Sequence, residues 1–147
     1  MFIESIELKN YRNYEQLSLA FDKGTNIFFG DNAQGKTNIL EAVYLCGTTK
    51  SHRGSKDREM IQFKAQEAHI RMFVNKGGVS RRIDMHLKKN KSKGIAIDGI
   101  PIRRASSRMV MPLRMQRIRI LSLTVIVASF VSSKVRCFHT YDYNSPK

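Results

Sequence analysis

Residues 30–37 read Gly-Asp-Asn-Ala-Gln-Gly-Lys-Thr, which is a complete Walker A phosphate-binding motif. The motif follows a short apolar run, residues 26–29, and leads into a helical pattern over residues 35–46. A phosphate-binding loop needs this order of strand, loop and helix, because loop amides and the helix N-terminus together face the phosphates. The sequence therefore predicts an α/β fold with a nucleoside triphosphate site at this loop.

The residue types in the motif match the chemistry of that site. Gly30 and Gly35 allow backbone conformations and close approaches that a Cβ would obstruct. Lys36 is placed to reach the β- and γ-phosphates, and the Thr37 hydroxyl is placed to ligate Mg²⁺. Backbone amides for the same site come from the rest of the loop, which is Asp31, Asn32, Ala33 and Gln34.

Alternating apolar and polar residues predict further strands. Residues 70–74 and 83–87 read as a hairpin joined at Gly77-Gly78. The unbroken apolar run of residues 27–29 predicts a strand covered on both faces. Gly47 is a natural stop for the helix. The remaining strand-like segments are residues 6–8, 17–21, 95–97 and 100–102.

A formal net charge of +14 favours polyanionic partners, above all nucleic acid. The alternative is a solvated basic surface without a partner. Residues 88–94 concentrate this charge in one loop, so Lys88, Lys89 and Lys91 could contact a phosphate backbone or could form a solvated hairpin turn. The longest apolar stretch, residues 121–131, is too short to span a bilayer. We therefore expect no membrane association.

The cysteines and histidines predict no metal centre. Cys46 and Cys137 lie far apart and indicate reduced thiols in a cytoplasmic protein, with Cys46 buried at the end of the helix. The four histidines have no metal-ligand spacing with cysteines or carboxylates, and we expect surface or packed roles for them. They are His52, His69, His86 and His139.

The composition changes near residue 105. Residues 1–104 hold 19 Lys/Arg against 11 Asp/Glu, whereas residues 105–147 hold 7 Lys/Arg and a single acid, Asp142. We therefore divide the chain into a nucleotide-binding lobe, residues 1–104, and a basic tail, residues 105–147. Three interpretations of the tail remain open: a DNA-binding or disordered tail, a buried strand with its flanks, and the product of a shifted reading frame.

Several separate segments of the first hundred or so residues resemble the RecF family of bacterial recombination mediators. The resemblance rests on an Arg-Asn-Tyr turn within residues 6–14, on Asn-Ala-Gln inside the phosphate-binding loop, and on the downstream Ser51-His52-Arg53 segment. Residues 55–59 and 95–104 also match. This combination is far more specific than a Walker A motif alone, which many families share.

The resemblance implies the N-terminal lobe of an ABC-type ATPase head, related to the SMC and Rad50 heads and truncated here. Such a lobe has a mixed sheet, the phosphate-binding helix and an antiparallel β region. The ATP site would be residues 30–37, with Arg12 and Asn13 as nucleotide contacts. The segment from Ser51 through His52 to Arg53 could contact phosphate or DNA, or could be an ordered polar loop.

The implied function is that of a DNA replication and repair protein that binds ATP and Mg²⁺. It would bind single-stranded or gapped DNA in the cytoplasm, dimerise when ATP is bound, and cooperate with RecO and RecR in loading RecA during the SOS response. Members of this family are more than twice as long, and nothing after residue 105 resembles their signature segment or Walker B acids. Because those acids complete the Mg²⁺ site, we expect no hydrolysis by this chain alone and assign no catalytic residue.

Two other functions are alternatives to this one. A truncated, non-enzymatic fragment would bind nucleotide weakly, or nucleic acid by charge alone. A P-loop kinase would need a catalytic base and lid arginines beyond the sheet, and the match over several segments argues against it.

Overall fold

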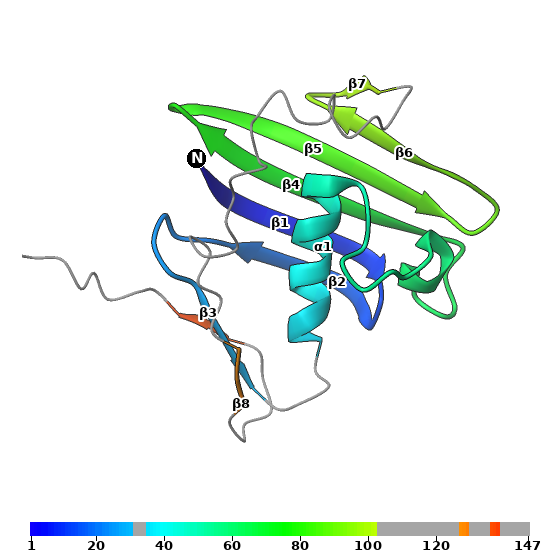
Figure 1. Ribbon diagram of the computed structural model, residues 1–147, viewed down its shortest axis with the longest axis horizontal. Helices are drawn as coiled ribbons and strands as arrows, with labels where there is room; N and C mark the ends of the chain where they lie inside the picture. The colour runs from blue at the N-terminus through cyan, green and yellow to red at the C-terminus, as the bar shows by residue number, and fades with distance from the viewer. Residues whose placement is uncertain (31–34, 103–126, 130–135, 139–147) are drawn as a thin grey trace, which may run out of the picture.

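The computed structural model describes residues 1–30, 35–102, 127–129 and 136–138. Most of the predicted tail, residues 105–147, and the central loop residues Asp31, Asn32, Ala33 and Gln34 lie outside this part of the chain. The described residues form two sheets, one α-helix and one short 3-10 helix. Figure 1 shows the larger sheet with α1 (Lys36–Thr48) lying across one of its faces.

The larger sheet has six strands in the order β2-β1-β4-β5-β6-β7, and every neighbouring pair is antiparallel. The hairpin predicted around Gly77-Gly78 is present as β4 and β5, which pair along their whole length. Antiparallel strands can be joined by a short turn, so most strands of this sheet lie beside the strand that comes next in the chain. The strand bounds are β1 Phe2–Tyr11, β2 Tyr14–Ala20, β4 Glu67–Lys76, β5 Val79–Lys88, β6 Lys91–Ile97 and β7 Ile100–Pro101.

Alternation along the strands divides the six-stranded sheet into an apolar and a polar face. Along β4, Ala68, Ile70, Met72 and Val74 are buried, and their neighbours are more exposed. The apolar face packs with α1 and the 3-10 helix η1 (Asp57–Met60). This core includes Ile6, Leu8, Tyr11, Ile39, Leu45, Cys46, Met60, Ile83, Met85 and Leu87, so the predicted burial of Cys46 is confirmed.

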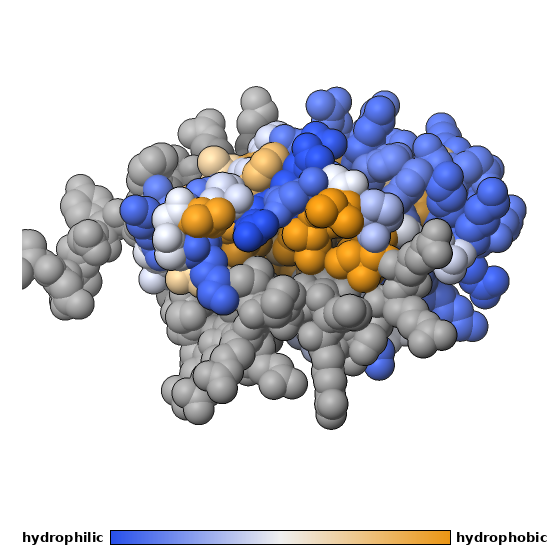
Figure 2. Space-filling model, turned by 90° about the horizontal axis from the view of Figure 1, so that it is seen from above, coloured by the Kyte–Doolittle hydropathy of each residue, from blue (hydrophilic) through white to orange (hydrophobic). Residues whose placement is uncertain are grey.

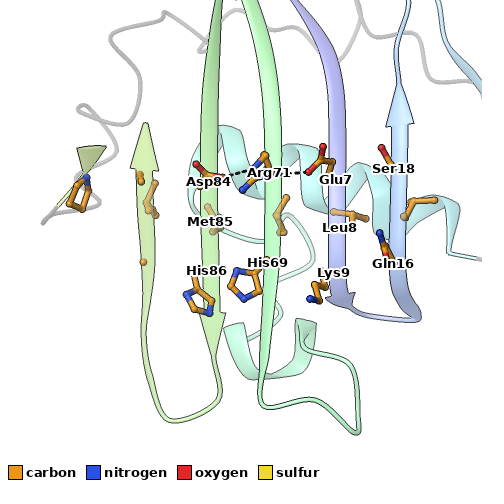
Figure 3. Close-up of a pocket in the computed structure, with 16 residues that line it drawn as sticks. Glu7, Leu8, Lys9, Gln16, Ser18, His69, Arg71, Asp84, Met85 and His86 are labelled. Atoms are coloured by element: carbon orange, nitrogen blue, oxygen red, sulfur yellow. Dashed lines mark hydrogen bonds and ion pairs between the residues drawn. The ribbon is translucent and has the colours of Figure 1, made fainter. Parts of the chain in front are cut away.

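The polar face of the same sheet is an open concavity of about 790 Å³. Figure 3 shows that Arg71 of β4 lies between Asp84 of β5 and Glu7 of β1. Its guanidinium is 2.8 Å from the Asp84 carboxylate and 3.4 Å from the Glu7 carboxylate. These exposed ion pairs link three adjacent strands across the face that α1 leaves uncovered.

The helix ends two residues later than its sequence indicated. Gly47 lies inside α1 and is buried, so the prediction that it stops the helix is wrong. The left-handed residue that ends the helix is Thr49, with φ 62°, and its amide donates to the Leu45 carbonyl at 2.7 Å.

The smaller sheet contains the strand that leads to the phosphate-binding loop. β3 (Ile27–Gly30) lies between β8 (Val127–Ser129), which is parallel to it, and β9 (Arg136–Phe138), which is antiparallel. Phe28 is buried, but Ile27 is 37% exposed. The prediction of a strand covered on both faces is therefore wrong at Ile27, because burial on one face is enough to hold a short strand.

Polar residues dominate one end of the molecule. Seen from above, polar residues gather at the right, the end that carries the β5–β6 hairpin, and an apolar patch lies near the centre (Figure 2). The exposed large apolar side chains of the described residues include Val79 and Ile100.

In the part of the chain that the structure describes, no helix is both long and apolar enough to cross a membrane.

Candidate nucleotide-binding site

The described part of the phosphate-binding motif lies where β3 ends and α1 begins. Gly35 is the N-cap of α1 in a left-handed conformation, φ 97°, and its carbonyl accepts from the Asn38 and Ile39 amides. Lys36 is the first helical residue and is only 5% exposed, whereas Thr37 is exposed. The order along the chain is as predicted: a strand that ends at Gly30, then Gly35, then the helix. The N-terminus of this helix offers the positive end of the helix dipole.

The turn between β1 and β2 packs directly against Gly35. A Cβ on Gly35 would lie 2.6 Å from both the Asn13 amide nitrogen and the Tyr14 hydroxyl. The Asn38 side chain donates to Asn13 Oδ1 at 2.8 Å. Asn13, predicted to contact the nucleotide, therefore lies beside the first turn of α1, close to the phosphate-binding loop.

We expect Gly35→Ala to disrupt this site. The substitution places a Cβ in contact with Asn13 and Tyr14 and also forces alanine into a positive φ, a conformation costing about 1–2 kcal/mol. Nucleotide binding should fall, and the melting temperature should drop. Gly77→Ala is the matched control, because Gly77 also has a positive φ, 60°, but has open space around its Cβ position. Equal nucleotide affinity in the two variants would contradict the packing argument.

Arg12 lies near the site but binds protein groups. It occupies the β1–β2 turn with φ 54°, and its guanidinium makes two 2.9 Å hydrogen bonds to the Glu41 carboxylate of α1. It also donates to the Ser55 hydroxyl at 2.7 Å and to the Glu59 carbonyl at 2.9 Å. Arg12 thus ties the turn, α1 and the loop before η1 together. A direct nucleotide contact by Arg12 stays a prediction.

The Glu41 carboxylate is fully buried and is paired with a guanidinium. Burial raises the pKa of Glu41, but hydrogen bonds from Arg12 and Ser51 outweigh it, and the net pKa lies below its ordinary value. Burial lowers the pKa of Arg12, and Glu41 more than restores it. Both groups therefore stay ionised at neutral pH.

Ser51 and His52 contact other protein groups, whereas Arg53 lies near the N-terminus of α1. The Ser51 hydroxyl donates to Glu41, and the His52 ring packs edge-on against Tyr44 with centroids 5.5 Å apart. The exposed Arg53 reaches Asn38 Oδ1 at 3.3 Å, which places its guanidinium near the N-terminus of α1. Arg53 is the member of this segment with the best access to an anion at the candidate site.

The basic hairpin lies at another place on the surface, at the right-hand end of Figure 1 beyond β5 and β6. Lys88 lies 3.6 Å from the Glu67 carboxylate, and Lys89 donates to the Phe63 carbonyl at 3.2 Å. Lys91 is exposed. The structure does not bring the hairpin lysines together with the phosphate-binding loop, so any contact they make with an anion would be separate.

Sequence reasoning missed Asn38, Glu41 and Tyr14. A signal for Glu41 was present, because it is an acid among the buried apolar positions of α1 and such a charge needs a partner. Asn38 and Tyr14 had no comparable signal, since their roles depend on how the β1–β2 turn docks against the helix.

The strand parallel to β3 carries no acidic pair. β8 pairs Ser129 with Gly30, so its described end lies level with the start of the phosphate-binding loop. Residues 127–129 are Val-Ala-Ser. These three described residues therefore supply no carboxylate at that position.

The chain is similar to known proteins over most of its length. The AAA domain family matches residues 5–136. The DNA replication and repair protein RecF of Lachnoclostridium phytofermentans is 68% identical over 106 residues, covering 72% of this chain and 29% of that protein. RecF of Lachnospira eligens is 62% identical over 105 residues, covering 71% of this chain and 29% of that protein. The chain thus spans less than a third of the length of these relatives.

Solved structures show the same likeness. A recombination mediator protein RecF bound to ATP superposes with a TM-score of 0.68 at 32% identity, over 71% of this chain and 28% of that one. The SMC head domain from Thermotoga maritima superposes with a TM-score of 0.59 at 19% identity, over 70% of this chain and 39% of that one. The second likeness concerns the fold alone, which is that of an ABC-type ATPase head.

Proposed function

Because the chain belongs to the AAA domain family and its first hundred or so residues correspond to the N-terminal part of RecF, we propose that it binds ATP with Mg²⁺ at residues 30–37. The observation that carries the proposal is Gly35, which caps the N-terminus of α1 in a left-handed conformation at the end of the motif that begins in β3. Lys36 would bind the β- and γ-phosphates, and the exposed Thr37 hydroxyl would ligate the metal.

ATP binding is tested by titrating the full chain with a fluorescent ATP analogue, with and without Mg²⁺. The Thr37 hydroxyl would hold Mg²⁺, which would offset phosphate charge, so affinity should be higher when the metal is present. Thr37→Ala should reduce this metal dependence. An affinity for the analogue that is the same with and without Mg²⁺ would contradict the assignment of Thr37.

We further propose that the chain acts on DNA in the cytoplasm, as part of replication and repair. The support is its net charge of +14, its basic hairpin and its similarity to RecF proteins. In this proposal the DNA is single-stranded or gapped, ATP promotes dimerisation, and RecO and RecR are partners in loading RecA during the SOS response. Ser51, His52 and Arg53 remain candidate DNA contacts, with Arg53 the most accessible near the nucleotide site.

Hydrolysis is not part of the proposal. The chain spans 29% of its relatives' length, and residues 127–129 beside β3 lack an acidic pair. A second candidate function follows from the same facts: a non-enzymatic piece that holds nucleotide weakly or binds nucleic acid by charge alone. The two functions differ in whether ATP changes the affinity for DNA.

DNA binding that depends on charge should fall steeply with salt. Each phosphate neutralised contributes about −0.9 to the slope of log affinity against log salt, so we expect a slope of several units between about 50 and 200 mM salt. Lys91→Ala, at an exposed hairpin lysine, should reduce that slope by about one. Lys76→Ala, at the end of β4 in the other hairpin, is the control and should not.

Anisotropy of a labelled gapped duplex measures both slopes. A flat salt response would exclude an electrostatic DNA interface. Equal slopes for Lys91→Ala and the parent would remove the β5–β6 hairpin from that interface. An affinity that ATP does not change would favour the second candidate function.

A further inference from the structure

We propose that Glu67, His69 and His86 form a binding site for a borderline divalent cation such as Zn²⁺ on the polar face of the six-stranded sheet. The three side chains each offer a ligand atom, and these atoms all lie within 4.8 Å of one another. Figure 3 shows His69 and His86 side by side on β4 and β5, on the face opposite α1. This site is distinct from the phosphate-binding loop.

The register of the sheet brings these residues together. His69 and His86 are directly opposite each other in the antiparallel pair β4–β5, and such neighbours have Cβ atoms about 4.5–5.5 Å apart. Glu67 lies two residues before His69 on β4, so strand alternation places both on one face. A spacing of 17 positions between the histidines carries no metal signature in sequence, which is why sequence analysis predicted no metal centre.

The side chains of Glu67, His69 and His86 are already in contact with one another. The two imidazoles are stacked with centroids 3.9 Å apart and an interplanar angle of 26°. The Glu67 carboxylate contacts both rings. One of its oxygens is 3.1 Å from His86 Nε2, and the other is 3.5 Å from His69 Nε2. One carboxylate thus contacts the metal-binding nitrogen of both rings.

The donor set selects the class of cation. Two imidazoles and a carboxylate are ligands typical of Zn²⁺, at about 2.0–2.2 Å, with a fourth position left for water or another group. Mg²⁺ prefers oxygen ligands and is disfavoured by imidazole. Small rotations of the two rings would turn both Nε2 lone pairs toward one ion. All three side chains are between about a third and a half exposed, so an ion can reach them.

Cationic neighbours should weaken this site. Lys88 Nζ is 3.6 Å from the same Glu67 oxygen that contacts His86, and it competes with a metal for that oxygen. Lys9 of β1 is opposite His69 in the register and lies beside it in Figure 3. Removing the Lys88 charge should therefore tighten metal binding, an effect that a merely structural histidine cluster would not show.

Calorimetric titration of the full chain with ZnCl₂ tests the site. We expect one ion per chain at this cluster, and a loss of affinity in His69→Ala and in His86→Ala that exceeds the about tenfold cost of losing an outer-shell partner. Lys88→Gln should bind Zn²⁺ more tightly than the parent. His52→Ala removes a histidine outside the cluster and is the matched control for imidazole number; its Zn²⁺ affinity should equal that of the parent.

Two further measurements keep the result independent of the nucleotide site. MgCl₂ should give no binding at the cluster, and Lys36→Ala should leave Zn²⁺ affinity unchanged. Because the substituted histidines are exposed, circular dichroism should show the parent fold in each variant. Zn²⁺ affinity that is absent in the parent, or equal in the parent, His69→Ala and His86→Ala, would overturn the proposal.

Discussion

Lys36→Ala should lower ATP affinity by about 10- to 150-fold. This range corresponds to the roughly 1.5–3 kcal/mol that hydrogen bonds to a charged group contribute. Lys36 is the first residue of α1 and is only 5% exposed, so its side chain is buried at the N-terminal end of the helix. A lysine at the start of a phosphate-binding helix should have its largest effect when the phosphates are present.

The fold should survive this substitution. Alanine has the highest helix propensity, and the position lies in the first turn of the helix. Circular dichroism of the variant should therefore match that of the parent. Lys76→Ala, which removes the same charge from the exposed end of β4, controls for net charge and should bind ATP normally. Equal ATP affinity in Lys36→Ala and in the parent would exclude Lys36 from the nucleotide site.

Local patterns in the sequence predicted much of this fold correctly. The apolar run before residue 30, the helical pattern after Gly35 and the alternation around Gly77-Gly78 each depend on residues close together in the chain. The structure confirms the strand β3, the helix α1 and the β4–β5 hairpin. Such features could be predicted because strand and helix periods are set by neighbouring residues.

Features that depend on distant residues could not be predicted in this way. The pairing of β1 with β4, more than fifty residues away, fixes the order of the sheet. His69 and His86 meet only because β4 and β5 pair in one register, and a shift of one residue would place them on opposite faces. The Arg12–Glu41 contact needs both the sheet turn and the helix to be in place.

The end of α1 shows a competition between a local rule and packing. Glycine is the common residue just after a helix, yet Gly47 is buried within the last turn, and Thr49 takes the left-handed position. Thr48 is bonded through its hydroxyl to the Tyr44 and Lys50 carbonyls, which stabilises this end without a glycine. The sequence alone could not rank these alternatives. The boundary near residue 105 and its origin stay predictions, since the tail lies mostly outside the described residues.

Arg12→Met should destabilise the fold by about 3 kcal/mol, the lower end of the cost of leaving a buried charge unpaired. The lower end applies because the Arg12 side chain is 20% exposed, although Glu41 is fully buried. The matched control is Arg71→Met. Arg71 is also 2.8 Å from a carboxylate, that of Asp84, but its side chain is 48% exposed, so its loss should cost about 0–1 kcal/mol. Urea unfolding at neutral pH measures both free energies.

The same pair predicts how stability depends on pH. The pKa of Glu41 in the folded chain lies below its ordinary value of 4.5, despite burial, because Arg12 and Ser51 hydrogen-bond to the carboxylate. A carboxyl whose pKa is lowered by folding stabilises the folded state. This contribution is complete above the pKa of the unfolded state and is lost as the pH falls through the pKa of the folded state. The parent should therefore lose this stability as the pH falls below 4.5. In Arg12→Met the effect of burial on the Glu41 pKa is no longer offset by Arg12, so the unpaired charge is neutralised at higher pH, and the free-energy difference between the two proteins should shrink steadily as the pH is lowered from neutral.

A double variant separates the pair from its surroundings. If the cost of Arg12→Met comes from the unpaired Glu41 charge, then adding Glu41→Leu should restore part of the lost stability, because an apolar pair of similar volume needs no partner. If the cost comes instead from the Arg12 bonds to Ser55 and the Glu59 carbonyl, the second substitution should restore nothing. A double variant no more stable than Arg12→Met alone would therefore show that Arg12 holds the turn through Ser55 and Glu59 and not through α1.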